Sequence, residues 1–181
     1  MPWNESADNE IKYFSGTARY SQHLYLKELN RNYNYVLDLG EVKNLAVVKV
    51  NGKVCGTLWR PPFTIDITDA LLGGDNTLEI DVTNLWVNRM VGDELEPDDV
   101  EWSEPVTFGA ASKSPSIGRF MKEVPEWLSK GTPRPTKRKA VVSMKFFEKD
   151  TPLLRSGLLG PVVLQKKTAN TVQPSVEKEL R

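Results

Sequence analysis

One short segment in the middle of the chain gathers the side-chain types that sugar-binding sites use. Trp86 offers an aromatic face for the apolar C–H groups of a sugar. Asn88, Arg89 and Asp93 could hydrogen-bond hydroxyls in directional pairs, and Trp102 could supply a second aromatic face to a polysaccharide. The preferred interpretation is structural: Trp86 packs in the core, while Arg89 and Asp93 pair with each other or cap the loop.

An acidic run overlaps this segment, and its oxygens could serve as ligands for a hard cation. It comprises Asp93, Glu94, Glu96, Asp98, Asp99, Glu101 and Glu104. Because Ca²⁺ prefers several oxygen ligands, a structural calcium site is one interpretation. The spacing matches no EF-hand loop, and a solvated loop is the preferred interpretation. The basic run Arg134–Lys139 is likewise expected to be a solvated loop that enters a strand.

The other side chains that commonly carry chemistry are few or poorly placed. His23 is the single histidine and Cys55 the single cysteine, so neither a zinc site nor an intramolecular disulfide is expected. Cys55 lies in an apolar stretch and is interpreted as a small buried hydrophobe. Ser156 lacks the glycine two positions earlier that a nucleophile elbow requires. We therefore expect no catalytic residue and no cofactor in this chain.

Composition and charge exclude several classes of protein. The 181 residues suit one domain with a sizeable core. Lys plus Arg and Asp plus Glu each number 24, so the net charge is zero and nucleic-acid binding is not expected. The sequence contains no run of about 18 apolar residues, which a membrane-spanning helix would require. The N-terminus lacks a signal-peptide pattern, so either the chain is cytoplasmic or Met1 is an artificial start within a longer exported protein.

The elements that must position these residues are predicted to be short strands. Along residues 16–26 apolar side chains alternate with polar ones, which is typical of a half-buried strand. The pair Asn51-Gly52 between two apolar runs predicts a tight hairpin, since both residues tolerate a positive φ. Strands are expected at residues 16–26, 35–39, 46–50, 53–58, 63–67, 77–83, 140–147 and 162–165.

Helical segments are expected to be few and short. A single helical turn is predicted at residues 70–72, capped by Thr68 or Asp69. One or two short helices are predicted within residues 117–128, where Pro125 interrupts the run.

Short strands joined by Gly and Asn turns, without a βαβ rhythm, favour an all-β jelly roll or β-sandwich. One or two short helices would lie in a long insertion of that sandwich. Residues 1–10 are interpreted as a disordered lead-in, 11–167 as the β-sandwich domain and 168–181 as a disordered tail.

Several motifs follow one another in a recognisable order. They are Leu37-Asp38-Leu39-Gly40, Val47–Gly52, Gly56, Pro62-Phe63, Ile65–Thr68 and Asn76-Thr77-Leu78. Their order resembles the sugar-binding-type jelly roll of family 2 glycosidases, a galactose-binding-like β-sandwich. In that family a late loop with an Arg and an Asp lies near the active site. Gly160 and Pro161 stand at those two places here, which weakens the inference that this loop binds substrate.

Further motifs narrow the resemblance. They are Val82-Thr83-Asn84, Trp86, Asn88-Arg89, Gly92-Asp93-Glu94, Pro125–Leu128, Lys149–Leu154 and Ser156–Val162. Together they resemble the C-terminal sandwich of glycoside hydrolase family 106, the α-L-rhamnosidases, over about residues 11–165. The resemblance implies that the catalytic carboxylates lie in a separate barrel domain, so no family catalytic residue is transferred to this chain. It also implies that the parent enzyme is exported, to the periplasm or outside the cell.

The resemblance implies a non-catalytic accessory β-sandwich module of an α-L-rhamnosidase-like glycoside hydrolase that acts in polysaccharide degradation. Such a module packs on or shapes a catalytic barrel domain, which is then its partner. The first alternative is an autonomous carbohydrate-binding module that grips a rhamnose-containing oligosaccharide through the candidate residues named above. The second alternative is a free-standing interaction protein derived from such an enzyme.

Overall fold

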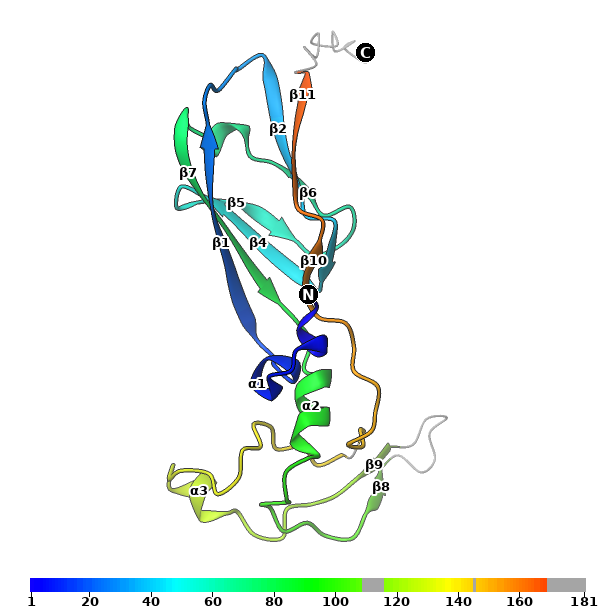
Figure 1. Cartoon of the computed structure of the whole chain (residues 1–181). Coiled ribbons are helices and arrows are strands. Elements are labelled where there is room, and N and C mark those ends of the chain that lie inside the picture. Colours follow the sequence, from blue (N-terminus) through cyan, green and yellow to red (C-terminus); the bar gives the residue numbers. More distant parts are fainter. Residues whose placement is uncertain (109–115, 145, 169–181) are drawn as a thin grey trace, which may run out of the picture. The chain divides into compact units, whose positions relative to one another are not determined.

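The fold was examined in a computed structural model of the chain, which describes residues 1–108, 116–144 and 146–168 (Figure 1). The chain divides into two compact units. Unit 1 comprises Met1–Gly16 and Leu85–Ser156. Unit 2 comprises Thr17–Asn84 and the chain from Gly157 onward. The strands of the sandwich belong to unit 2, whereas most of the long insertion belongs to unit 1.

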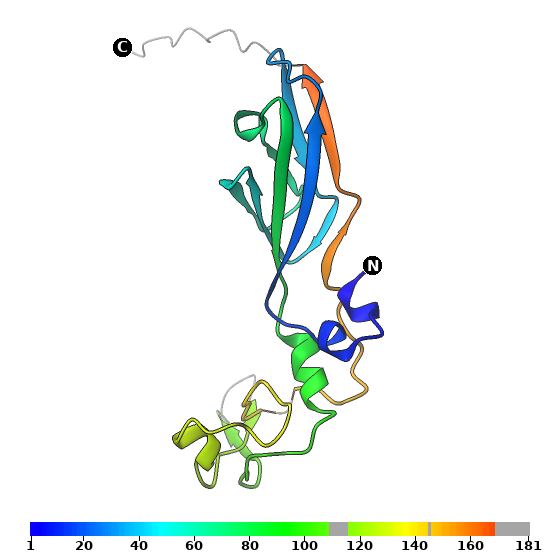
Figure 2. The ribbon, with the colours of Figure 1, turned by 60° about the vertical axis from the view of Figure 1, so that its left-hand side comes forward.

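The first layer of unit 2 is a four-stranded antiparallel sheet. In spatial order its strands are β1 (Thr17–Leu26), β7 (Gly74–Thr83), β4 (Leu45–Val50) and β5 (Lys53–Leu58) (Figures 1 and 2). Along β4, and along β7 from Asn76 onward, every second residue is buried. This period of two is what a sheet with one covered face requires. The predicted strand at residues 16–26 is confirmed as β1.

The predicted hairpin at Asn51-Gly52 is confirmed between β4 and β5. Asn51 has a φ of 52° and Gly52 a φ of 77°, and two successive positive φ angles are typical of the type I′ turn that matches strand twist. The Asn51 side chain donates to the Ala70 carbonyl at 2.9 Å and accepts the Thr77 N–H at 2.9 Å. Asn51 therefore serves the turn and also ties it to the start of β7.

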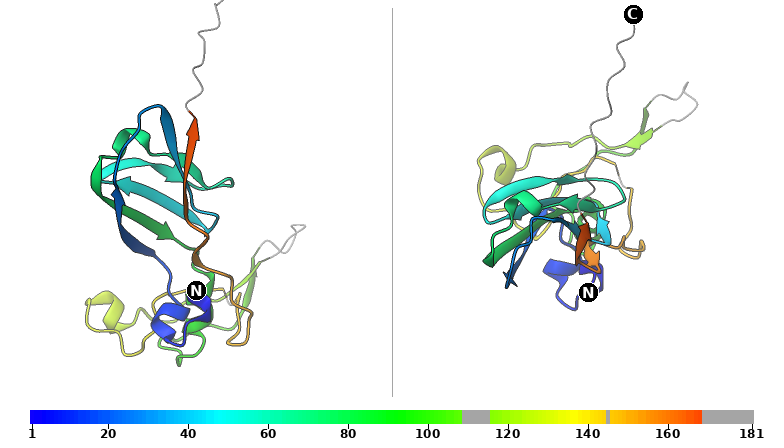
Figure 3. Two further views of the ribbon diagram at one scale, coloured as in Figure 1. Left: turned by 45° about the horizontal axis from the view of Figure 1, so that its top comes forward. Right: turned by 90° about the horizontal axis from the view of Figure 1, so that it is seen from above.

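The second layer of unit 2 is a three-stranded antiparallel sheet, with a two-stranded ribbon continuing along the chain. The sheet order is β11 (Val163–Thr168), β2 (Tyr33–Asp38) and β6 (Thr64–Asp66), and the ribbon pairs β10 (Gly157–Gly160) with β3 (Glu41–Lys43). Figure 3 views the layers of unit 2 from two further directions. Gly40 follows β2 with a φ of 63°, a backbone conformation that glycine adopts without steric cost.

The core of unit 2 is aliphatic and draws on both layers. Its most deeply buried side chains include Leu37, Leu39, Val48, Val50, Ile67, Leu71 and Val82. Removal of this apolar area from water is the main term that holds the layers together. The all-β sandwich predicted from the sequence is thus confirmed.

The single helical turn of unit 2 lies two residues earlier than predicted, as the 3₁₀ turn η2 (Thr68–Ala70). Thr68 is its first residue and not its cap. The Thr68 hydroxyl instead accepts the N–H of Tyr35 at 2.7 Å, and the Thr68 N–H donates to the Asp66 carboxylate at 2.9 Å. Through these two hydrogen bonds Thr68 links η2 to β2 and β6.

Unit 1 consists of short elements. They are η1 (Trp3–Glu5), α1 (Asn9–Lys12), α2 (Val87–Asp93), β8 (Val106–Phe108), β9 (Ser116–Gly118) and α3 (Glu126–Ser129). Residues 1–10, expected to form a disordered lead-in, contain η1 and bury Trp3, whose ring meets Phe14 edge-on at 5.5 Å. α3 begins directly after Pro125. None of the helices that the structure describes is both long and apolar enough to cross a membrane.

The prediction of a strand at residues 140–147 is wrong. Its described residues form no strand, because other groups of unit 1 take its backbone hydrogen bonds. The Ala140 N–H donates to the Asp93 carboxylate at 2.8 Å, and the Ala140 carbonyl accepts from Arg134 at 3.0 Å. The Ser143 carbonyl accepts the Arg119 N–H at 2.8 Å. The first residue of the predicted tail, Thr168, is the last residue of β11, and residues 169–181 lie outside the described residues.

Candidate functional site

Helix α2 positions three of the five candidate carbohydrate-binding residues. It starts after Trp86, spans Val87–Asp93 and buries Asn88 and Asp93 on its inner face. The i and i+4 positions lie on one side of a helix, which brings Arg89 next to Asp93. The position of these side chains is therefore set by the geometry of a helix that is not among the elements predicted from the sequence.

Asn88 is used inside unit 1. Its side chain is 2% exposed. Its amide nitrogen donates to the Leu154 carbonyl at 2.7 Å, and its amide oxygen accepts the Leu154 N–H at 2.8 Å. The amide nitrogen also lies 3.4 Å from the Ser156 hydroxyl. The Asn88 amide thus pairs with both backbone groups of Leu154, as the backbone of a neighbouring strand would. It joins α2 to the segment around Leu154, and its amide nitrogen and oxygen are both used in these bonds.

Arg89 and Asp93 form the ion pair that the structural interpretation predicted. Arg89 Nε donates to Asp93 Oδ1 at 2.9 Å, and the two side chains are 12% and 4% exposed. The Asp93 carboxylate also accepts the backbone N–H groups of Lys139 and Ala140 at 2.8–3.1 Å. Asp93 therefore anchors the segment that the sequence predicted to be a strand.

The two candidate tryptophans have different environments. Trp86 is 60% exposed, so it does not pack in the core as the structural interpretation expected. Trp102 is half-buried and carries the Arg119 guanidinium over its ring, 5.1 Å from the ring centre. Carbohydrate binding by either indole stays a prediction.

Parts of the acidic and basic runs pair with each other, which corrects the expectation of two separate solvated loops for those parts. Arg134 makes two hydrogen bonds to the Asp99 carboxylate, at 2.6 and 2.8 Å. Arg138 contacts Glu94 at 3.2 Å and Asp98 at 3.0 Å. We call these five residues the charged cluster. The side chains of its arginines are 13–15% exposed and that of Asp99 only 2%, whereas those of Glu94 and Asp98 are 23% and 58% exposed. The Arg134–Asp99 pair is therefore withdrawn from water, while Asp98 lies at the surface. Glu101 and Glu104 of the acidic run are exposed, as expected.

Electrostatics within the charged cluster favour the ionised form of Asp99. The hydrogen bond from Arg134 lowers the pKa of Asp99 below its ordinary value, more than burial raises it, and the hydroxyl of Thr136 adds to the lowering. Two opposite charge runs in one sequence were the signal that could have predicted this pairing. No group of three or more metal-ligating side chains is gathered in the part of the chain that the structure describes.

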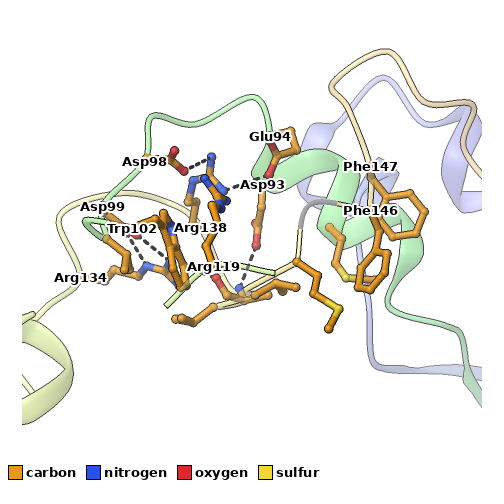
Figure 4. A pocket seen from close by; sticks show the side chains of 16 residues that line it. Asp93, Glu94, Asp98, Asp99, Trp102, Arg119, Arg134, Arg138, Phe146 and Phe147 are labelled. Atoms are coloured by element: carbon orange, nitrogen blue, oxygen red, sulfur yellow. Dashed lines mark hydrogen bonds and ion pairs between the residues drawn. The ribbon is translucent and has the colours of Figure 1, made fainter. Parts of the chain in front are cut away.

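A small pocket lies beside the charged cluster (Figure 4). Asp93 and Trp102 line it together with Arg119, Phe146 and Phe147, whereas the other three candidates do not. Its volume is about 40 Å³, which is room for a few water molecules and not for a sugar ring. The structure therefore brings two of the five candidate residues to one pocket, and the pocket is a gap within an ion-paired framework.

A larger hollow of about 450 Å³ lies within unit 2, between its two layers. Leu24 on β1, Leu78 on β7, Leu158 on β10 and Leu164 on β11 line it, and no charged side chain does. Such a lining offers neither an acid nor a base. Glycoside hydrolysis needs two carboxyl groups about 5–10 Å apart across a cleft, and this hollow does not supply them.

Unit 2 also carries side chains that the sequence analysis did not single out. An open hollow of about 310 Å³ borders the connection from β5 to β6, where Trp59 is 67% exposed. The run Trp-Arg-Pro-Pro between two apolar strands was the available signal. Nearby, Cys55 is half-buried, and this partial burial raises the pKa of its thiol, so the thiolate form is disfavoured.

The sequence and fold of this chain were compared with those of known proteins. No family model matches the chain. A protein of Formosa agariphila named "Putative beta-glucuronidase" is 44% identical over 162 residues, which are 88% of this chain and 13% of that protein. The rhamnosidase of Novosphingobium sp. PP1Y is 34% identical, with a TM-score of 0.66, over 92% of this chain and 12% of that chain.

A beta-glucuronidase of an uncultured Clostridium sp. is 28% identical over 46% of this chain and 15% of that chain, with a TM-score of 0.42. This chain thus spans 12–15% of the length of these three proteins. It contains a β-sandwich that resembles part of large glycosidases of the family 2 and family 106 type.

Proposed function

We propose that this chain is a non-catalytic accessory module of a large glycoside hydrolase of the α-L-rhamnosidase type. The observation that carries the proposal is the match to the Novosphingobium rhamnosidase, which extends over 92% of this chain but only 12% of that enzyme. The matched part therefore includes residues of both units. In the proposed role the chain packs on a catalytic barrel domain and helps to shape its rim.

The chemistry of the described residues supports a non-catalytic role. Buried acids of unit 1 are held by arginines, as Asp93 is by Arg89 and Asp99 by Arg134. The hydrogen bond from Arg134 lowers the pKa of Asp99 below its ordinary value, so Asp99 is a weak proton donor. General acid catalysis needs the opposite, a carboxyl group whose pKa is raised.

The assignment to a rhamnosidase needs a test of its own, because the Formosa relative is named a beta-glucuronidase. The Novosphingobium rhamnosidase allows a direct test. Removing its matching segment should lower hydrolysis of a chromogenic α-L-rhamnoside, and grafting this chain in its place should restore it. The chain alone should release no chromophore from either a rhamnoside or a glucuronide.

Two outcomes would contradict the proposal. One is turnover by the isolated chain above the blank. The other is a graft that folds but stays at the activity of the deletion variant while the native segment restores activity. A graft that restores hydrolysis of a glucuronide in a glucuronidase, but not of a rhamnoside, would reject the rhamnosidase type alone.

The carbohydrate-binding alternative relied on side chains that the fold uses in other ways. Asn88 and Asp93 are buried, the Arg89 side chain is 12% exposed, and all three are hydrogen-bonded within unit 1. A ligand would have to displace these bonds, and each broken buried pair would leave a polar group unsatisfied. We therefore prefer the accessory role to sugar binding at these three residues.

A further inference from the structure

The connection between β5 and β6 presents an aromatic side chain on a restrained backbone. We call Trp59, Arg60, Pro61 and Pro62 the Trp59 loop, and all four residues are exposed. Two consecutive prolines restrict its φ angles. Directly after them Phe63 is 7% exposed, and its carbonyl accepts the Leu39 N–H at 2.9 Å. The loop is therefore short and anchored at both ends, by β5 and by Phe63.

Trp59 is mostly exposed to solvent. Its side chain is 67% exposed, although tryptophan is on average among the highly buried residues. An indole face can pack against the apolar C–H face of a sugar ring, and its N–H can bond a hydroxyl. The adjacent hollow of about 310 Å³ is bordered by the Trp59 loop and by Thr57, Leu58 and Thr64. Small-molecule sites start at about 300 Å³.

Arg60 adds a positive charge to this aromatic surface. Its guanidinium lies over the Trp59 ring, 5.4 Å from the ring centre. Among the residues that the structure describes, no acidic side chain forms an ion pair with Arg60. This contrasts with Arg134 and Arg138, whose charges are compensated. A guanidinium without an acidic partner is suited to bind a carboxylate through two parallel hydrogen bonds.

From these observations we propose that the Trp59 loop binds a sugar ring that carries a carboxylate, that is, a uronic acid residue of an oligosaccharide. The Trp59 indole packs on the ring face and Arg60 receives the carboxylate, while the hydroxyls of Thr57 and Thr64 lie on the border of the hollow. This site goes beyond the proposed accessory role, which needs no sugar contact. It is also separate from the five candidate residues of unit 1.

Nuclear magnetic resonance of the chain tests the proposal, using methyl β-D-glucuronide and methyl β-D-glucoside as a matched pair of probes. The two differ at the carboxylate. We expect the indole N–H signal of Trp59 to shift with the glucuronide, with an affinity about tenfold above that for the glucoside. Raising the ionic strength should reduce this preference, since the contact is charged and exposed.

Three variants sharpen the test. Trp59→Ala should abolish binding of both probes, and Arg60→Gln should bring the glucuronide to the affinity of the glucoside. Trp86→Ala is the matched control, because Trp86 is similarly exposed at 60% but belongs to unit 1, and it should change neither affinity. Circular dichroism should confirm that all three variants fold, as expected for exposed side chains.

The proposal fails if the probes shift the Trp86 or Trp102 signal instead, or if the two probes bind equally. It also fails if neither probe binds at near-saturating sugar concentration. In that last case, loss of activity on Trp59→Ala in the grafted enzyme would assign the Trp59 loop to a protein contact. The accessory role would then stand while the sugar site would not.

Discussion

At the scale of single residues, the glycines of unit 2 separate two physical effects, backbone conformation and space. Gly52 has a φ of 77° and no atom within 4 Å of the position a Cβ would take. Gly73 has equally open surroundings but no positive φ. Gly40 has a φ of 63° and lies against the backbone of Gly160. The three positions therefore allow the two effects to be measured separately.

Gly52→Val should lower the free energy of unfolding by about 1 kcal/mol or more, because a β-branched residue is penalised at positive φ. Urea denaturation measures this difference. Gly73→Val is the control and should change the free energy by less than about 0.5 kcal/mol, as typical surface substitutions do. Equal effects at the two positions would argue against the type I′ turn.

Gly40→Ala should cost more than Gly52→Ala, because the added Cβ would clash with the Gly160 backbone as well as strain φ. We expect about 1 kcal/mol for Gly52→Ala and about 3 kcal/mol for Gly40→Ala. Thermal denaturation of the two variants side by side gives the comparison. A smaller loss at Gly40 would mean that β3 and β10 separate easily there.

At the scale of elements, unit 1 depends on ion pairs in place of a large apolar core. Its buried apolar side chains include Trp3, Val91 and Val100, far fewer than in unit 2. The charged cluster joins the chain after α2 to the chain after α3. A buried pair contributes little relative to an apolar pair but is costly to break from one side.

Arg134→Met should destabilise unit 1 by about 3 kcal/mol, because it leaves the Asp99 carboxylate buried without its guanidinium. Lys130→Met is the control. It removes the partner of Glu126 in a pair whose side chains are 62% and 81% exposed, and its effect should be below about 0.5 kcal/mol. The double variant Arg134→Met with Asp99→Leu should regain stability, which chemical denaturation can measure.

The same pair predicts an acid response of unit 1. Because the pKa of Asp99 in the folded chain lies below its value in the unfolded chain, the stabilisation is complete above about pH 4. It is lost as the pH falls through the folded pKa. Stability measured between about pH 5 and pH 2 should fall less steeply in Asp99→Asn than in the parent chain. An unchanged slope would mean that Asp99 is not ion-paired.

At the scale of the whole molecule, the two units should respond differently to acid. Unit 2 rests mainly on apolar burial, and its paired carboxylate Asp81 has a pKa far below its ordinary value because Arg19 and Lys49 donate to it, so that pair persists to low pH. Unit 1 has few buried apolar side chains and depends on the Arg134–Asp99 pair. Four of the five tryptophans, Trp3, Trp86, Trp102 and Trp127, belong to unit 1. Tryptophan fluorescence should therefore change at a higher pH than the far-ultraviolet signal of the strands. Coincident transitions would show one cooperative structure.

Local sequence signals specify most strands of the sandwich of unit 2, although not β3 and β10. Alternation along β1, β4 and β7 and the Asn51-Gly52 turn are local signals, since side-chain period and positive φ are properties of neighbouring residues. The predicted strands of unit 2 are found within a few residues of their expected bounds. The resemblance to large glycosidases likewise followed from motifs that lie mostly on these strands and turns.

The roles of the polar residues of unit 1 depend instead on partners that are distant in the sequence. Asp99 meets Arg134 across 35 residues, and Asn88 meets Leu154 across 66. Such partners cannot be read from local periodicity, because they depend on where the chain returns. The same contacts convert a predicted strand at residues 140–147 into a segment held by Asp93 and Arg134. Tertiary structure also left Trp59 in water while it covered Trp3, a difference between two identical side chains that only their surroundings explain.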